Sequence, residues 1–270
     1  VDLYVGGAEH TVGHLLYSRF WNNFLFDKGF SPVKEPFKKL VHPGMLLGEN
    51  GEKMSKSKGN VINPDDVINE YGADVMRVYE MFMGPITDAK PWNKQNIEGA
   101  RRFILKVWSL YINDDKIKDE ENKNLEKLYH KTVKKVTEDY ENMSFNTAIS
   151  QMMIFVNAVQ KENVFPREYA CGFIKLLNPV APFITEEIWE RVFDSNNVID
   201  YQTWPQFNEE LTKDDEIEIP VQVNGKVKAR IKITANEAQD KVLAAAKQAV
   251  GVTNACLLYT SPSPRDRTRS

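Results

Sequence analysis

The stretch GENGEKMSKSKGN, residues 48–60, lies between an apolar, strand-like segment and a helix with a strong start signal. It carries Lys53, Lys56 and Lys58 with serines interleaved and glycines around them. Lysine offers mobile positive charge, serine hydroxyls and backbone amides offer directed donors, and glycine lets the backbone approach a ligand closely. The stretch therefore predicts a flexible loop that can wrap a polyphosphate, although a solvated surface loop would have a similar composition.

Two blocks of sequence resemble one known family. The residues KMSKS, 53–57, match a signature of class I aminoacyl-tRNA synthetases, and NPDDVINEYGADVMR, 63–77, resembles the segment after that signature in the leucyl branch. The block DLYVGGAEHTVGHLLYSRFW, 2–21, resembles the leucyl-type segment that forms the wall of the adenylate pocket, with Gly13 in place of a larger residue. The chain thus resembles the C-terminal portion of the leucyl family of bacterial type.

The resemblance implies a ligase that uses ATP, with Mg2+ bound to the ATP and no further metal site. Such an enzyme activates leucine to leucyl-adenylate, releases pyrophosphate and transfers the leucyl group to tRNA(Leu). The resemblance implies that Lys56 is the first choice for the catalytic contact to pyrophosphate and Lys53 the second. Neither lysine acts as a base. Fixed positive charge assists such a reaction by meeting the charge that develops on phosphate oxygens.

The same resemblance implies further site residues. The implied ATP-binding residues are Ser55, Ser57, Gly6, Gly7, Glu9 at the ribose, Gly44, Met45 and Leu46, and His10 and His14 border the amino-acid pocket. Ordinary structural roles remain open for several of them. Glu9 can act as a charge at a helix N-terminus, and the histidines, Met45 and Leu46 can be packing residues.

Composition limits the class of protein. The chain has 270 residues, 42% hydrophobic and 27% charged, which is typical of soluble globular proteins with more than one domain. The net charge of -3 gives no overall basic signature, so contacts to nucleic acid must come from local patches. Cys171 and Cys256 lie far apart without metal-ligand spacing, and neither a signal peptide nor a membrane-length apolar run occurs. We therefore expect a cytoplasmic protein.

The order of patterns predicts a multidomain α/β plus all-α chain. Residues 1–92 are expected to form the C-terminal part of a Rossmann-like catalytic domain, with a strand at 1–5, a helix over 10–26 and a second helix that starts at Asn63 and Pro64. Residues 93–198 are expected to form an anticodon-binding-type helix bundle. Its three apolar stripes are Ile97, Ala100, Ile104, Val107, Trp108 and Tyr111; Leu125, Leu128, Val133, Val136 and Tyr140; and Phe145, Ile149, Met152, Val156 and Val159 after a Ser144 cap. The charge-rich stretch 113–124 between the first two stripes is interpreted as a solvated connection.

Residues 199–255 are expected to form a small, truncated C-terminal α/β domain. Two alternating runs flank Asn224 and Gly225, which is a strong signal for a two-residue hairpin, and a helix is expected over 236–250. Lys226, Lys228, Arg230 and Lys232 are expected on one face of the second strand, with Val227, Ala229, Ile231 and Ile233 on the other. The basic face can contact tRNA or can be the polar side of a half-buried strand. Residues 256–270 resemble a translated sequencing adapter and are not expected to belong to the native fold.

The sequence leaves alternatives open. It contains neither the second class I signature, HIGH, nor an editing domain, so we expect a truncated gene product or one subunit of a split enzyme whose missing N-terminal half is its partner. A sister synthetase for valine or isoleucine would share the KMSKS loop and the bundle but would differ in the stretch GGAEHTVGHLLYSRF, residues 6–20. A non-catalytic tRNA-binding module would have no reason to retain Lys56.

Overall fold

The structure is a computed structural model that describes residues 1–194, 196–213, 216–223, 226–234 and 239–249. The chain divides into two compact units, Val1–Leu211 and Thr212 onward. Residues 199–211 thus belong with the first unit, whereas the sequence analysis grouped them with the C-terminal domain. The suspected adapter at 256–270 and the turn at Asn224 and Gly225 lie outside the described residues.

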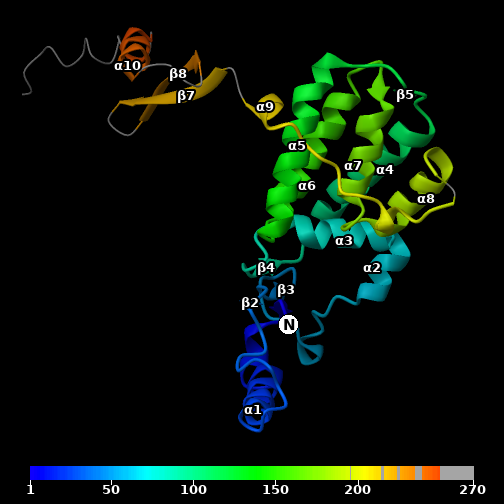
Figure 1. Cartoon of the computed structure of the whole chain (residues 1–270), viewed down its shortest axis with the longest axis vertical. Helices are drawn as coiled ribbons and strands as arrows, with labels where there is room; N and C mark the ends of the chain where they lie inside the picture. The colour runs from blue at the N-terminus through cyan, green and yellow to red at the C-terminus, as the bar shows by residue number, and fades with distance from the viewer. Residues whose placement is uncertain (195, 214–215, 224–225, 235–238, 250–270) are drawn as a thin grey trace, which may run out of the picture. The chain divides into compact units, whose positions relative to one another are not determined.

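The first unit begins with a parallel strand–helix–strand unit (Figure 1). Strand β1 (Leu3–Val5) pairs in parallel with β2 (Lys39–Val41), and α1 (His14–Asp27) lies between them in sequence. A short 3₁₀ helix, η1 (Ala8–Thr11), precedes α1, so the expected helix over 10–26 begins later than predicted. A parallel pair joined through a helix is the element from which Rossmann-like domains are built.

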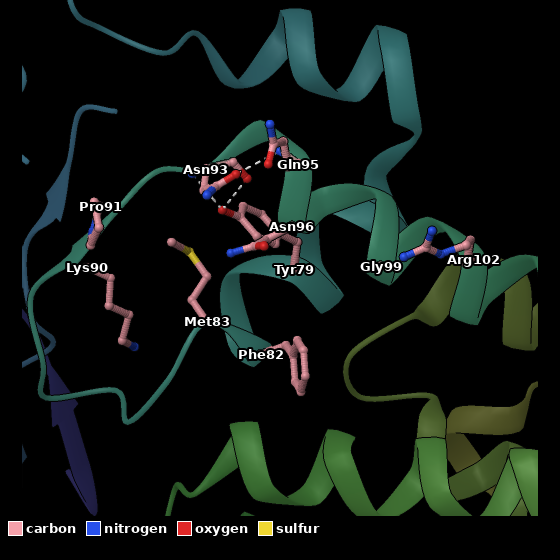
Figure 2. A pocket seen from close by; sticks show the side chains of 10 residues that line it. All are labelled: Tyr79, Phe82, Met83, Lys90, Pro91, Asn93, Gln95, Asn96, Gly99 and Arg102. Carbon is pink, nitrogen blue, oxygen red and sulfur yellow. Dashed lines mark hydrogen bonds between the residues drawn. The ribbon is translucent and has the colours of Figure 1, made fainter. Parts of the chain in front are cut away.

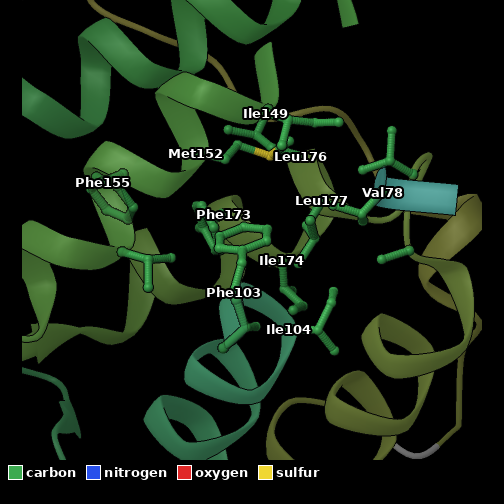
Figure 3. Close-up of a cluster of buried hydrophobic side chains, with 14 of the residues drawn as sticks. Val78, Phe103, Ile104, Ile149, Met152, Phe155, Phe173, Ile174, Leu176 and Leu177 are labelled. Carbon is green, nitrogen blue, oxygen red and sulfur yellow. The ribbon is translucent and has the colours of Figure 1, made fainter. Parts of the chain in front are cut away.

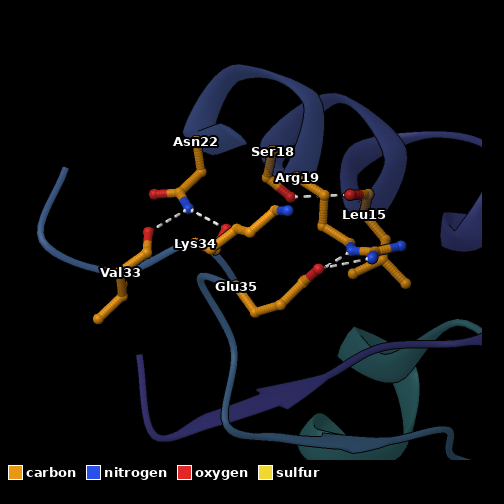
Figure 4. Close-up of polar contacts among 7 residues, drawn as sticks. All are labelled: Leu15, Ser18, Arg19, Asn22, Val33, Lys34 and Glu35. Carbon is orange, nitrogen blue, oxygen red and sulfur yellow. Dashed lines mark hydrogen bonds and ion pairs between the residues drawn. The ribbon is translucent and has the colours of Figure 1, made fainter. Parts of the chain in front are cut away.

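Helix α1 has two different faces. On one face, Asn22 donates from Nδ2 to the carbonyl oxygens of Val33 and Lys34 at 2.9 and 2.7 Å, and Arg19 forms a two-point ion pair with Glu35 (Figure 4). These bonds fix the loop that leads to β2. The opposite face is an aromatic face, between 46% and 64% exposed, that consists of Leu16, Tyr17, Phe20, Trp21 and Phe24. No residue of α1 is buried.

A second parallel pair joins the KMSKS region to the bundle. Strand β3 (Leu46–Leu47) pairs with β4 (Lys90–Pro91), and α2 (Pro64–Tyr71) and α3 (Ala73–Phe82) lie between them in sequence. The side chain of Asn63 accepts a hydrogen bond from the Asp65 amide at 3.3 Å, and Pro64 occupies the first turn. The predicted start of α2 is therefore confirmed.

The bundle consists of α4 (Lys94–Ile112), α5 (Lys123–Glu141), α6 (Phe145–Val159), α7 (Arg167–Leu177) and α8 (Pro182–Val192). Most members of the three predicted stripes are buried in one core (Figure 3). Trp108, Leu128 and Tyr140 are partly buried and pack against it. Ser144 stands at the N-cap position of α6, although its side chain makes no capping hydrogen bond.

The connection at 113–124 is not simply solvated, as the sequence analysis interpreted it. Within it, β5 (Ile117–Lys118) pairs in parallel with β6 (Phe165–Pro166), and Ile117 packs against the core. After α8, η3 (Ile199–Tyr201) and the following segment also lie on the bundle, because Trp204 donates from Nε1 to Thr137 Oγ1 at 2.8 Å. Helix α9 (Glu209–Thr212) follows and contains the boundary between the two units in the sequence.

A buried carboxylate holds α3 against α8. Asp74 is 8% exposed and accepts hydrogen bonds from the Phe183 amide at 3.2 Å and the Ile184 amide at 2.6 Å, in the first turn of α8. Arg77 donates to the carbonyl of Pro179 at 3.0 Å. Burial raises the pKa of Asp74, and the two amide donors partly oppose that rise. Helix α3, the second helix after the KMSKS loop, is thus fixed to the bundle by polar bonds as well as by packing.

The second unit contains β7 (Glu216–Val223), antiparallel to β8 (Lys226–Thr234), and α10 (Gln239–Gln248). The two strands predicted on either side of Asn224 and Gly225 are confirmed as an antiparallel pair, in which Val223 pairs with Lys226. The predicted alternation holds at Ile233, which is buried, but is wrong at Val227, which is 52% exposed. The reason is a bulge opposite Val221 and Gln222, where β8 contains one extra residue. The extra residue shifts the alternation, so every second residue of β8 no longer lies on the same face.

In the part of the chain that the structure describes, every helix is too short or too polar to cross a lipid bilayer.

Candidate functional site

The KMSKS loop has a rigid frame. It leaves β3 through an antiparallel bridge between Leu47 and Lys53, and the Gly48 amide donates to the Glu52 carbonyl at 2.8 Å. Gly51, with φ of 74°, makes the turn inside this closure. A left-handed backbone at this point favours glycine, so the sequence determines where the loop reverses.

Asn60 ties the signature residues to the loop's exit. Its Oδ1 accepts from the Ser55 amide at 2.8 Å, and its Nδ2 donates to the Lys53 carbonyl at 3.3 Å. Between these bonds lies the 3₁₀ helix η2 (Lys56–Lys58), and the hydroxyls of Ser55 and Ser57 are 2.7 Å apart. The backbone of the signature is therefore held, Met54 packs against the core, and Lys53, Lys56 and Ser57 remain exposed.

The three lysines of the loop differ in their surroundings. Lys58 pairs with Glu52 at 2.8 Å, so much of its charge is already compensated within the loop. The ammonium groups of Lys53 and Lys56 make no hydrogen bond or ion pair with any residue that the structure describes. Two such cations beside two hydroxyls form a donor set suited to phosphate oxygens.

The turn after β1 carries the predicted site residues of the block at residues 2–21. His14 Nδ1 lies 3.0 Å from the Tyr4 hydroxyl, and the two rings stack, so this histidine is held in place. His10 and Glu9 are exposed, and their side chains approach to 3.9 Å. The Glu9 carboxylate lies over Gly7, where a Cβ would meet it at 2.3 Å. Gly7 thus leaves space that an acidic side chain fills.

Packing explains part of the third set of predicted site residues, Gly44, Met45 and Leu46. A Cβ at Gly44 would lie 2.0 Å from the carbonyl oxygen of Asp88, so the close approach of the neighbouring segment requires glycine there. Leu46 packs against the core, whereas Met45 is 43% exposed. Of these three predicted nucleotide contacts, Met45 is the side chain most available to a ligand.

The segment between β2 and β3 connects the two motifs. The Gly6 amide donates to Val41 at 3.2 Å, and Gly6 accepts at its carbonyl from His42 Nδ1 at 2.8 Å. The same segment continues through Gly44 and β3 into the KMSKS loop. The glycine turn and the lysine loop are therefore attached to opposite ends of one short, hydrogen-bonded stretch.

Sequence reasoning missed two features. Nothing in the local sequence marks Asp74, because its partners are far away in the sequence. A cavity of about 500 Å³ between α3, β4 and α4 was also not foreseen (Figure 2). One signal could have drawn attention to it, because Gly99 stands in the middle of a strong helix.

Comparisons with known proteins agree with this organisation. Residues 2–93 match the family model for tRNA synthetases class I (I, L, M and V), and residues 122–243 match that of the anticodon-binding domain of tRNA ligase. The chain is also similar to the LeuRS of Agrobacterium radiobacter, solved as a ternary complex with tRNA and LeuAMS. That similarity has 31% sequence identity and a TM-score of 0.75 over 95% of this chain. The chain spans 36% of the length of that relative.

Proposed function

Because this chain belongs to the class I tRNA synthetases of the I, L, M and V group, we propose that it is the C-terminal portion of a leucine-tRNA ligase. In the complete enzyme, ATP with Mg2+ and leucine would give leucyl-adenylate and pyrophosphate. The leucyl group would then pass to tRNA(Leu). The N-terminal part of the catalytic domain is the required partner, and the cytoplasm is the proposed location.

The observation that carries the proposal is the state of the KMSKS loop. Its backbone is fixed by Asn60 and by the bridge to β3, while Lys53 and Lys56 project without partners among the described residues. Because the backbone of the loop is already held, binding of phosphate oxygens has to order only the lysine side chains and not the loop itself. Lys56 is the first choice for the pyrophosphate contact because it lies in η2, at the exposed tip of the loop.

The choice of leucine over valine or isoleucine rests on two supports. The block at residues 2–21 resembles the leucyl branch, and the similar solved structure is a LeuRS. In the proposed enzyme, His10 and His14 border the amino-acid pocket, and Gly6, Gly7, Glu9 and Met45 contact the nucleotide. Tyr4, which stacks on His14, would keep that ring in one orientation.

The test is amino-acid-dependent exchange between ATP and pyrophosphate. The chain is mixed with a separately purified N-terminal portion of a leucyl-tRNA synthetase, and exchange is measured with leucine, isoleucine and valine in turn. We expect exchange with leucine when both parts are present, and none from this chain alone. Exchange that follows valine or isoleucine instead, or none with any of the three, would contradict the proposal.

A further inference from the structure

The cavity between α3 and α4 combines apolar surface, amides and positive charge. Its apolar part consists of Tyr79, Phe82, Met83 and Pro91, and its polar part of Lys90, Asn93, Gln95, Asn96 and Arg102, with Gly99 in the wall. Figure 2 shows Met83, Asn96 and Tyr79 near the centre, with Lys90 on one side and Arg102 on the opposite side. A volume of about 500 Å³ is within the range of small-ligand sites.

The charge of this cavity differs from that of other cavities among the described residues. Its lining carries two cations and no carboxylate. A cavity between the starts of α5 and α7 is lined by Glu121, Glu126 and Glu168, and a more apolar cavity beside α8 contains Asp74. In a chain with net charge -3, a cavity with only positive charge in its lining favours an anionic ligand.

Both cations have unused hydrogen-bonding capacity. Lys90 donates to the carbonyl of Gly84 at 2.8 Å, which leaves further N–H groups of its ammonium for a ligand. Burial lowers the pKa of Lys90, in keeping with its position inside the cavity wall. Arg102 is exposed and makes no hydrogen bond or ion pair with the residues described by the structure. The side-chain amides of Gln95 and Asn96 are likewise without partners in that part of the chain.

Gly99 is an independent pointer to a ligand. A glycine inside a helix costs about 0.5–1 kcal/mol relative to alanine. Internal packing does not explain this glycine, because a Cβ built there meets nothing within 4 Å. What the missing side chain does provide is an open path to the backbone of α4 at the cavity wall. This open path allows a close approach by a ligand.

We propose that this cavity binds one nucleotide of an RNA strand, with its base against Phe82 and Met83 and its flanking phosphates near Lys90 and Arg102. RNA is commonly recognised through bases that leave the stack and lie on apolar or aromatic side chains, while lysine and arginine hold the backbone. The amides of Gln95 and Asn96 can read polar edges of the base. The inference rests on the proposed function in one respect, since that function makes tRNA the RNA in question.

Three variants test the site in the full chain. Gly99→Leu fills the open wall with a residue that favours helix, so it should raise the melting temperature and still weaken RNA binding. Arg102→Ala should weaken binding about tenfold and reduce the slope of log affinity against log salt by about one. Arg101→Ala is the matched control, because Arg101 is a neighbouring cation on α4 that pairs with Glu98 at 3.6 Å and does not line the cavity.

The measurement is fluorescence anisotropy with a labelled tRNA(Leu) transcript over a series of salt concentrations. The proposal requires that Gly99→Leu and Arg102→Ala both lower the affinity while Arg101→Ala stays within about twofold. Equal effects of Arg101→Ala and Arg102→Ala, no loss with Gly99→Leu, or a parent chain that does not bind the transcript would overturn it. Binding of free AMP at millimolar concentration that is lost in Arg102→Ala but does not displace the labelled transcript would show a site for free nucleotides and overturn it too. Leucine-dependent exchange is read separately, so either proposal can fail alone.

Discussion

Replacement of Asp74 by alanine tests whether α3 is held to α8 by the bonds that the structure shows. Two amides, of Phe183 and Ile184, would lose a charged acceptor. Removal of the acceptor leaves these amide donors without a partner in the protein, which costs about 1–3 kcal/mol whether the lost carboxyl group was charged or protonated. Loss of a helix cap alone costs about 0.5–2 kcal/mol. We therefore expect Asp74→Ala to lower the free energy of unfolding by about 2–3 kcal/mol.

The assay is thermal unfolding of the whole chain, monitored by circular dichroism. For a domain of this size, the expected loss corresponds to a fall in melting temperature of roughly 5–10 °C. Asp66→Ala is the control, because Asp66 is an exposed acid in the first turn of α2, and its loss should cost less than about 1 kcal/mol. Equal effects of the two substitutions would refute the idea that Asp74 joins α3 to α8.

The pH dependence of the same contact has a definite sign. The pKa of Asp74 is raised above 3.8 by burial in the folded protein. The native state therefore holds this proton more tightly than the unfolded chain does, and the stability that this provides is complete below the unfolded pKa. It is lost as the pH rises through the folded pKa. The difference in unfolding free energy between the parent and Asp74→Asn should thus narrow as the pH rises from 4 towards neutral, and a difference that widens would contradict the burial of the carboxylate.

Three further substitutions test other parts of the chain. Lys56→Ala in the two-part enzyme should lower the single-turnover rate of adenylate formation about a hundredfold while leucine binding changes little, and a rate within about threefold of the parent would remove the loop from the chemistry. Gly172→Ala should destabilise the bundle by about 1–3 kcal/mol in urea unfolding, because its Cβ would lie 1.8 Å from the buried hydroxyl of Tyr129, and an unchanged midpoint would show that the ring can move. Charge reversal at Lys228 and Arg230 should weaken tRNA binding and flatten its salt dependence, whereas an unchanged slope would make them solvated residues of β8.

Sequence patterns predicted the elements whose causes are local. The start of α2 is set by Asn63 and Pro64, and the bundle helices are set by apolar spacing that needs no knowledge of the partner helix. The loop's turn at Gly51 is local too, because a positive φ is easiest for glycine.

Features that depend on distant parts of the chain were not predictable. Asp74 lies 109 residues from Phe183 and 110 from Ile184, so its role exists only once α8 is in place. Ile117 sits within a run of charges, and its pairing with Phe165 overrides the polar pattern around it. The exposure of Val227 depends on a bulge whose origin lies in the pairing of two strands. At the site, the sequence suggested which lysines matter, but only the structure separates Lys58, paired with Glu52, from the other two lysines of the loop.

The aromatic face of α1 affects how the chain behaves in solution. Leu16, Phe20 and Phe24 form a stripe along the helix, and Tyr17 and Trp21 widen it. Together they form a contiguous hydrophobic surface that is exposed to solvent. Two copies that meet through this surface would each remove it from solvent. Mass measured by light scattering should therefore increase with protein concentration, and mild detergent should reverse the increase. Fluorescence of Trp21 would shift to the blue as the copies associate, which gives this self-association an optical signal.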